Sequence, residues 1–112
     1  MAVPEPGARA TVVGTDDPAG ALDPEDAKLV VLARSAAVRA GGTGAAVRDD
    51  SGRTYLAGPV SVGPLRLGAV EAAVAQAAAS GVTRLQAVAV VGGEQPDPEL
   101  LAAVGSPAVV RG

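Results

Sequence analysis

The side chains in this sequence that could bind a ligand or move a proton are carboxylates, hydroxyls and guanidinium groups, because the chain contains no His and no Cys. A catalytic zinc ion is normally held by three His, Cys or carboxylate side chains, with a fourth position left for water. Glu71 and Glu99 are the carboxylates that could in principle serve such a centre. The alternative is that Glu71 lies on the surface or in a salt bridge, and that Glu99 helps Asp97 to start a helix.

Ser61 and Arg66 suggest a different chemistry, the binding of an anion or a nucleotide at the end of a helix. The alternative is that both are solvated loop residues. Gly92, Gly93 and Glu94 lack the spacing of a phosphate-binding loop, so they do not extend this candidate site.

The composition predicts one small domain with a thin core. The chain has 112 residues, close to the usual size of about 100 to 200 residues for one domain. Ala (25) and Val (18) supply most of its apolar residues, and Tyr55 is the only aromatic residue. Helices must therefore lie close to a sheet, and burial in an oligomer would help such a domain. The abundance of Ala, Val, Gly and Arg is also typical of GC-rich bacterial genomes.

The charge pattern argues against nucleic acid and membranes as partners. The net charge is −3, and no run of basic residues is long enough to form a nucleic-acid-binding stripe. No apolar run approaches the 18 or more residues of a membrane span, and the N-terminus lacks the pattern of a signal peptide. We therefore expect a cytoplasmic protein.

Two Asp-Pro-Glu sequences, at Asp23 and Asp97, predict helix starts, because Asp caps a helix, Pro suits its first position and Glu favours its positive end. The first helix should end at Gly41 and Gly42. Residues 1–22, rich in Pro, Gly and Asp, should form a flexible arm before a domain over residues 23–112. The other expected elements are a hairpin over residues 45–57, a loop over 61–64, a helix over 65–80, a strand over 85–91 buried on both faces, a helix through 104 and a strand over 108–110.

The order of the expected elements is helix, hairpin, helix, strand, helix, strand. Alternation in the second half predicts parallel βαβ units with right-handed crossovers and helices on both faces of the sheet. The order alone leaves open a small α/β domain of some other kind.

Four segments narrow this choice: AAVRDDSGRTY, a Gly-Pro-Val-Ser loop, LRLGAVEAAVAQAAASGVTRLQAVAVVG and PDPELLAAV. Together they resemble the cytidine deaminase family, in which a hairpin leads to a ribose-gripping loop, followed by a helix, a strand and a second helix. The resemblance covers about residues 23–110. It implies a three-layer α/β/α fold whose mixed sheet has about four strands, with an antiparallel hairpin and parallel βαβ units.

The same resemblance implies an active site that this chain has lost. In the family, zinc activates a water, and a glutamate two residues after the first ligand shuttles protons during attack on C4 of the pyrimidine. The ribose-gripping positions fall near Pro59 and Ser61. The resemblance places the first zinc ligand at Gly68, the proton shuttle at Val70 and the paired ligands of the next helix near Glu99 and Ala102. None of these four positions has the family's residue.

We therefore predict a catalytically inactive domain of this family that acts as a binding or assembly module and uses no cofactor. The alternative is a zinc-dependent nucleoside deaminase with an atypical site, its metal held by carboxylates alone or supplied by a partner. The expected partners are further copies of the chain, another protein, or a weakly bound nucleoside or nucleotide.

Overall fold

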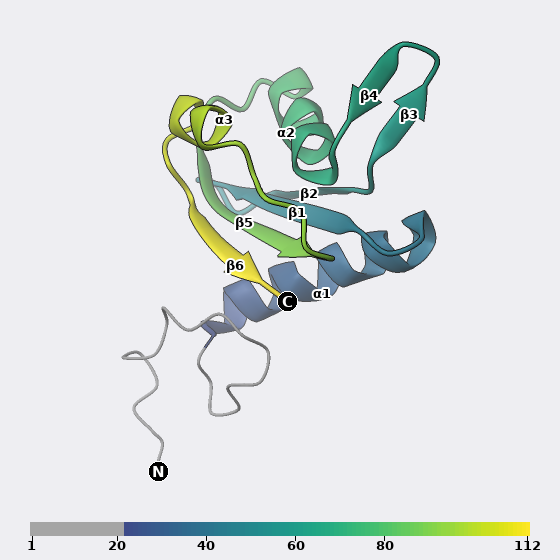
Figure 1. Cartoon of the computed structure of the whole chain (residues 1–112). Helices are drawn as coiled ribbons and strands as arrows, with labels where there is room; N and C mark the ends of the chain where they lie inside the picture. Colours follow the sequence, from purple (N-terminus) through teal and green to yellow (C-terminus); the bar gives the residue numbers. More distant parts are fainter. Residues whose placement is uncertain (1–21) are drawn as a thin grey trace.

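The protein has three layers, with a four-stranded sheet between helix α1 on one face and helices α2 and α3 on the other (Figure 1). This computed structural model describes residues 22–112. The sheet order is β2-β1-β5-β6, and a separate two-stranded sheet pairs β3 with β4. The elements in chain order are α1 (Pro24–Ala40), β1 (Gly44–Asp49), β2 (Thr54–Ala57), β3 (Val60–Val62), β4 (Leu65–Leu67), α2 (Ala69–Ala79), β5 (Leu85–Val91), α3 (Pro98–Ala103) and β6 (Ala108–Arg111).

The predicted α/β/α fold with a mixed four-stranded sheet is confirmed. Strands β1 and β2 form the expected antiparallel hairpin, and β5 pairs with β6 in parallel through α3. Within residues 22–112, this β5-α3-β6 unit is the one parallel crossover, because β1 runs antiparallel to β5. Strand β5 is buried on both faces, as its apolar run predicts.

Both Asp-Pro-Glu sequences begin helices. The Asp23 side chain accepts a hydrogen bond from the Glu25 N–H at 2.8 Å, and Asp97 does the same for the Glu99 N–H at 2.9 Å. Each carboxylate satisfies one of the donors that a helix start leaves without a partner inside the helix. Helix α1 ends at Gly41, whose positive φ of 89° suits glycine.

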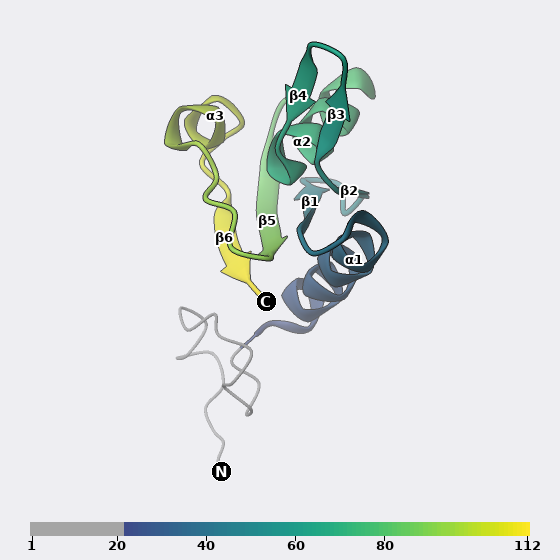
Figure 2. The same ribbon diagram turned by 45° about the vertical axis from the view of Figure 1, so that its right-hand side comes forward.

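The segment before α2 differs from the expected loop and helix start. A loop over residues 61–64 and a helix from residue 65 were expected, but residues 60–67 form the β3–β4 hairpin and α2 begins at Ala69. The physical reason is alternation: Val60, Val62, Leu65 and Leu67 lie on one side of a ribbon that turns at Gly63, whose φ is 54°. The hairpin projects from the body beside α2 (Figure 1; Figure 2).

The core lies in two clusters, one on each face of the sheet. Strand β5 sends Val88 and Val90 towards α2, and Ala87 and Ala89 towards α1. Leu22, the one described residue of the predicted N-terminal arm, packs on the α1 side. The rest of the arm lies outside the described residues, so the boundary with the domain at residue 23 stays a prediction. Among residues 22–112, no helix is long and apolar enough to cross a membrane.

Small residues let α1 lie directly on the sheet. Ala33, Ala36 and Ala37 are buried, and Gly44 of β1 sits beneath them. A Cβ atom at Gly44 would collide with the backbone oxygen of Ala33 and the backbone nitrogen of Ala37. Because these atoms belong to the helix backbone, no side-chain rotation could relieve the collision.

We predict that Gly44→Ala lowers the free energy of unfolding by about 1–3 kcal/mol, as overpacking usually does. Urea denaturation followed by circular dichroism measures this loss. Lys28→Ala, on the exposed side of the same helix, is the control and should change stability by less than about 0.5 kcal/mol. Equal stability of Gly44→Ala and the wild type would contradict the close packing of α1 on β1.

Asp49 organises the turn between β1 and β2. Its buried Oδ1 accepts hydrogen bonds from the Ser51 hydroxyl at 2.8 Å and from the N–H groups of Ser51 and Arg53, both at 2.9 Å. Burial by itself would raise the pKa of Asp49. These three hydrogen bonds and the charge of Arg53 outweigh burial and hold the pKa of Asp49 below its usual value.

The lowered pKa predicts that Asp49 stabilises the fold above about pH 4, where the carboxyl of the unfolded chain is ionised. This contribution should be lost as the pH falls through the lower pKa of the folded state. Asp49→Ala should therefore destabilise the protein at neutral pH, and the gap to the wild type should narrow in acid. Asp50→Ala, at the exposed neighbouring residue, is the control. A gap that stays constant from neutral pH to about pH 2 would contradict this role.

Candidate functional site at the start of helix α2

The start of α2 binds two carboxylates from its own chain. The Gly68 N–H donates to Oε1 of Glu71 at 2.6 Å, which closes half of a capping box. The Ala69 N–H donates to Oε1 of Glu94 at 2.8 Å, and the Val70 N–H donates to Oε2 of Glu94 at 3.0 Å. The positive end of a helix favours such anions. Three consecutive backbone donors are therefore satisfied internally.

Glu94 reaches the start of α2 from the loop between β5 and α3, which is remote from α2 in the sequence. Arg111 of β6 holds this loop: its Nη1 donates to the Glu94 backbone oxygen at 3.0 Å and its Nη2 to the Gln95 side-chain oxygen at 2.9 Å. Gly92 and Gly93 have φ values of 108° and 93°, which glycine adopts without strain. The loop, the edge strand and the helix start thus form one connected unit.

Gly68 and Glu94 occupy the same small space. A Cβ atom built on Gly68 would lie 2.8 Å from Oε2 of Glu94 and 3.1 Å from its Cδ. A side chain at residue 68 would therefore require the end of the flexible Glu94 side chain to shift. The lack of a side chain at Gly68 leaves room for Glu94 in its present position.

The other positions named from the sequence lie apart from this contact. Val70 is buried in the α2-side core, whereas Glu99 and Ala102 are exposed on α3. Ser61 and Arg66 are cross-strand partners in the β3–β4 hairpin, and both are exposed. The structure thus brings Ser61 and Arg66 together, but on the projecting ribbon rather than at the end of a helix. Pro59 is also exposed, just before β3.

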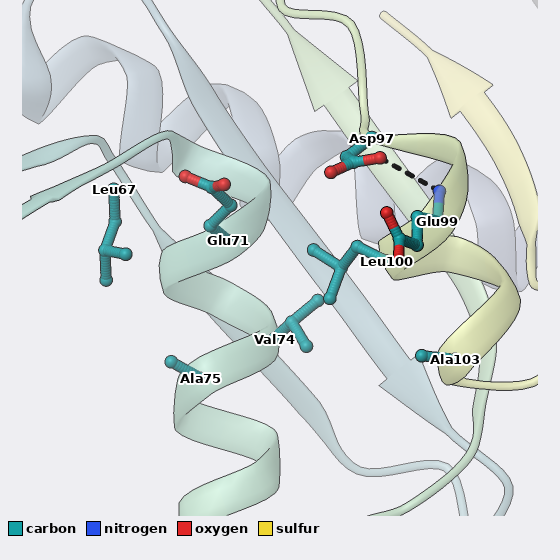
Figure 3. Close-up of a pocket in the computed structure, with 8 residues that line it drawn as sticks. All are labelled: Leu67, Glu71, Val74, Ala75, Asp97, Glu99, Leu100 and Ala103. Atoms are coloured by element: carbon teal, nitrogen blue, oxygen red, sulfur yellow. Dashed lines mark hydrogen bonds between the residues drawn. The ribbon is translucent and has the colours of Figure 1, made fainter.

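A groove runs between α2 and α3 (Figure 3). Its volume is about 470 Å³, within the range of about 300–1,000 Å³ that is typical of ligand sites. The carboxylates of Glu71, Asp97 and Glu99 gather at one end, with Val74 and Leu100 beside them (Figure 3). Its lining residues are Leu67, Glu71, Val74, Ala75, Asp97, Glu99, Leu100 and Ala103.

This arrangement, a mixed sheet covered by α2 and α3 on one face and α1 on the other, defines a three-layer α/β/α domain. Residues 22–110 match the family described as cytidine deaminase-like. The chain therefore belongs to the cytidine deaminase-like family. No curated protein matches the chain.

The residues present do not fit the zinc ion that this family implies. The position that the resemblance assigns to the first ligand is Gly68, which has no side chain, and the Glu94 carboxylate lies beside it. Glu94, Glu71 and Asp97 already accept hydrogen bonds from helix starts. Within residues 22–112, no three His, Cys, Asp or Glu side chains form a group that could hold a metal ion. No chemical step through zinc can be derived for these residues.

Glu94 is the site residue that sequence reasoning missed. The Gly-Gly-Glu sequence lacks the spacing of a phosphate-binding loop, and this spacing says nothing of a helix cap. The signal that could have identified Glu94 is its place just after the buried strand, because an acidic side chain in this loop can reach a neighbouring helix start. Its partner at Gly68 is far away in the sequence, which hides the pairing. Glu71 is exposed, in agreement with the surface alternative, and its carboxylate accepts a hydrogen bond from the Gly68 N–H, a capping role that the sequence did not predict.

We predict that Glu94→Ala and Gly68→Ala each lower the free energy of unfolding by about 0.5–2 kcal/mol, the usual cost of losing a helix cap. Both changes remove the same contact, one by deleting the carboxylate and the other by displacing it. The double variant should therefore lose less than the sum of the two single variants. Urea denaturation of the four proteins forms the cycle, and strict additivity would contradict the contact.

Proposed function

We propose that this domain is a catalytically inactive member of the cytidine deaminase-like family that acts as a binding or assembly module. The observation that carries the proposal is the Gly68–Glu94 contact. It replaces the side chain of the first zinc ligand with a carboxylate that is committed to two backbone N–H groups of α2.

The chemistry of the remaining positions supports the same proposal. Val70 stands where the family has its proton shuttle, and a valine side chain cannot accept or donate a proton. Ala102 likewise offers no metal ligand. The deaminase alternative would require Glu71, Glu94 or Asp97 to leave its helix cap, at a cost of about 0.5–2 kcal/mol each. It would also require those carboxylates to converge on one ion.

A binding role agrees with the surface of the described residues. Val31, Val38, Val62 and Leu65 are large apolar residues that remain exposed, and the α2–α3 groove is mostly apolar. We propose protein contacts, including contacts between copies of this chain, as the use of these surfaces. A weak nucleoside or nucleotide site at Ser61 and Arg66 is a second candidate, supported by the pairing of these two residues across the hairpin. The cytoplasmic location stays a prediction.

We predict that the purified protein carries well under one zinc per chain, gains no thermal stability from added zinc and does not deaminate cytidine. Inductively coupled plasma mass spectrometry, thermal unfolding and an ultraviolet deamination assay measure these three properties. Glu94→Ala, which frees the helix start without adding a ligand, should behave in the same way. Stoichiometric zinc, or a deamination activity that a chelator removes, would contradict the proposed function.

A further inference from the structure

The outer face of α1 carries an exposed apolar and basic patch. Val31 and Val38 are 60% and 78% exposed, and residues seven apart lie on the same side of a helix. Arg34 lies three and four residues from these valines, so it flanks them on one side, and Arg39 is also exposed. We call Val31, Arg34, Val38 and Arg39 the α1 patch. Helices that pack into grooves do so through apolar residues on one face, and Val31 and Val38 have the i, i+7 spacing of two such anchors.

The α2–α3 groove has the opposite character. Five of its lining residues are apolar, three are acidic and none is basic. Glu71 and Asp97 are held in place by their hydrogen bonds to helix starts, so their charges have fixed positions. The groove is flanked by two helices, and a third helix can lie along such a surface.

The α1 patch and the groove cannot meet within one molecule. Helix α1 covers one face of the sheet, and α2 and α3 cover the other (Figure 1; Figure 2). The two surfaces match in chemistry, because valines meet an apolar floor and arginines meet carboxylates. A contact between two copies of the chain would bring them together.

We propose that the α1 patch of one copy docks in the α2–α3 groove of a second copy. This inference rests on the proposed function and names the surfaces of the assembly. Because the two surfaces differ, the contact is heterologous, and its repetition produces a ring or an open filament rather than a two-fold dimer. The arginines of the patch face Glu71, Asp97 and Glu99 of the next copy.

The first experiment blocks each surface in turn. Sedimentation velocity across a concentration series measures self-association of the wild type, Val38→Glu and Ala103→Arg. Both substituted residues are exposed in the single chain, so the fold is retained, and circular dichroism checks this. Each change should weaken association at least about tenfold, because it places a charge in an apolar contact. Thr83→Glu is the control: Thr83 is exposed between α2 and β5, outside both the α1 patch and the groove, and its substitution should leave association unchanged.

The second experiment exchanges the charges. One variant carries Arg34→Glu and Arg39→Glu, and another carries Glu99→Arg. The first variant should associate at least about tenfold more weakly than the wild type, because its acidic patch faces an acidic groove, and Glu99→Arg should weaken association by lowering the negative charge of the groove. An equimolar mixture should associate again, since the unchanged groove of the first variant can meet the unchanged patch of the second. The triple variant has both surfaces changed and should associate no better than the first variant.

The proposal is overturned if the wild type remains a monomer at all concentrations tested, or if the mixture of charge variants does not associate. It is also overturned if the wild type associates but Val38→Glu and Ala103→Arg have no effect. Failure of the proposed function has a different signature, namely bound zinc or deamination by the wild-type chain. Self-association is measured separately from zinc binding and deamination, so the two failures can be told apart.

Discussion

Glu94 connects three parts of the fold that are remote in sequence: the start of α2, the β5–α3 loop and the edge strand β6. Two N–H groups at the start of α2 bind it, and Arg111 of the edge strand β6 holds the loop that delivers it. A helix start has several donors without partners inside the helix and a positive end, so an anion is the most effective group to place there. Because this anion comes from the β5–α3 loop, the position of α2 over the sheet and the path of the chain into α3 are set together.

The second constraint is the size of the side chains. Alanine and glycine at the α1–β1 contact let backbone approach backbone, and the buried face of α2 is built from Ala69, Ala72, Ala73 and Ala77 with two valines. Such packing is dense, but it removes less apolar area from water per residue than leucine or phenylalanine would. The domain therefore depends more on its capped helices and its hydrogen-bonded turns than a domain with a bulky core. Asp23, Asp49, Asp97 and Glu94 all serve in this way.

Local signals predicted most of the fold, and contacts between distant residues explain what they missed. The caps at Asp23 and Asp97, the hairpin turn at Asp49 and the buried strand β5 each follow from a few adjacent residues. The spacing of Leu67 from Val70 and Val74 is helical, which predicts that Leu67 belongs to the second helix. The alternation from Val60 to Leu67 and the turn at Gly63 compete with that spacing and prevail. The direction of β1 against β5 also depends on how the sheet assembles, which no local pattern specifies.

The sequence predicts the candidate site from the family's zinc ligands and proton shuttle, which are missing there. The structure adds Glu94, which no local pattern connects to the site. A Cβ atom at residue 68 would lie 2.8 Å from Oε2 of Glu94, so a ligand side chain there would require the Glu94 side chain to shift. Displacing Glu94 would leave the Ala69 and Val70 N–H groups without their partner and would disturb the loop that Arg111 holds. The start of α2 is therefore occupied by a structural anion, so a ligand side chain at residue 68 would need more than the return of a His or Cys, because the Glu94 side chain would also have to move.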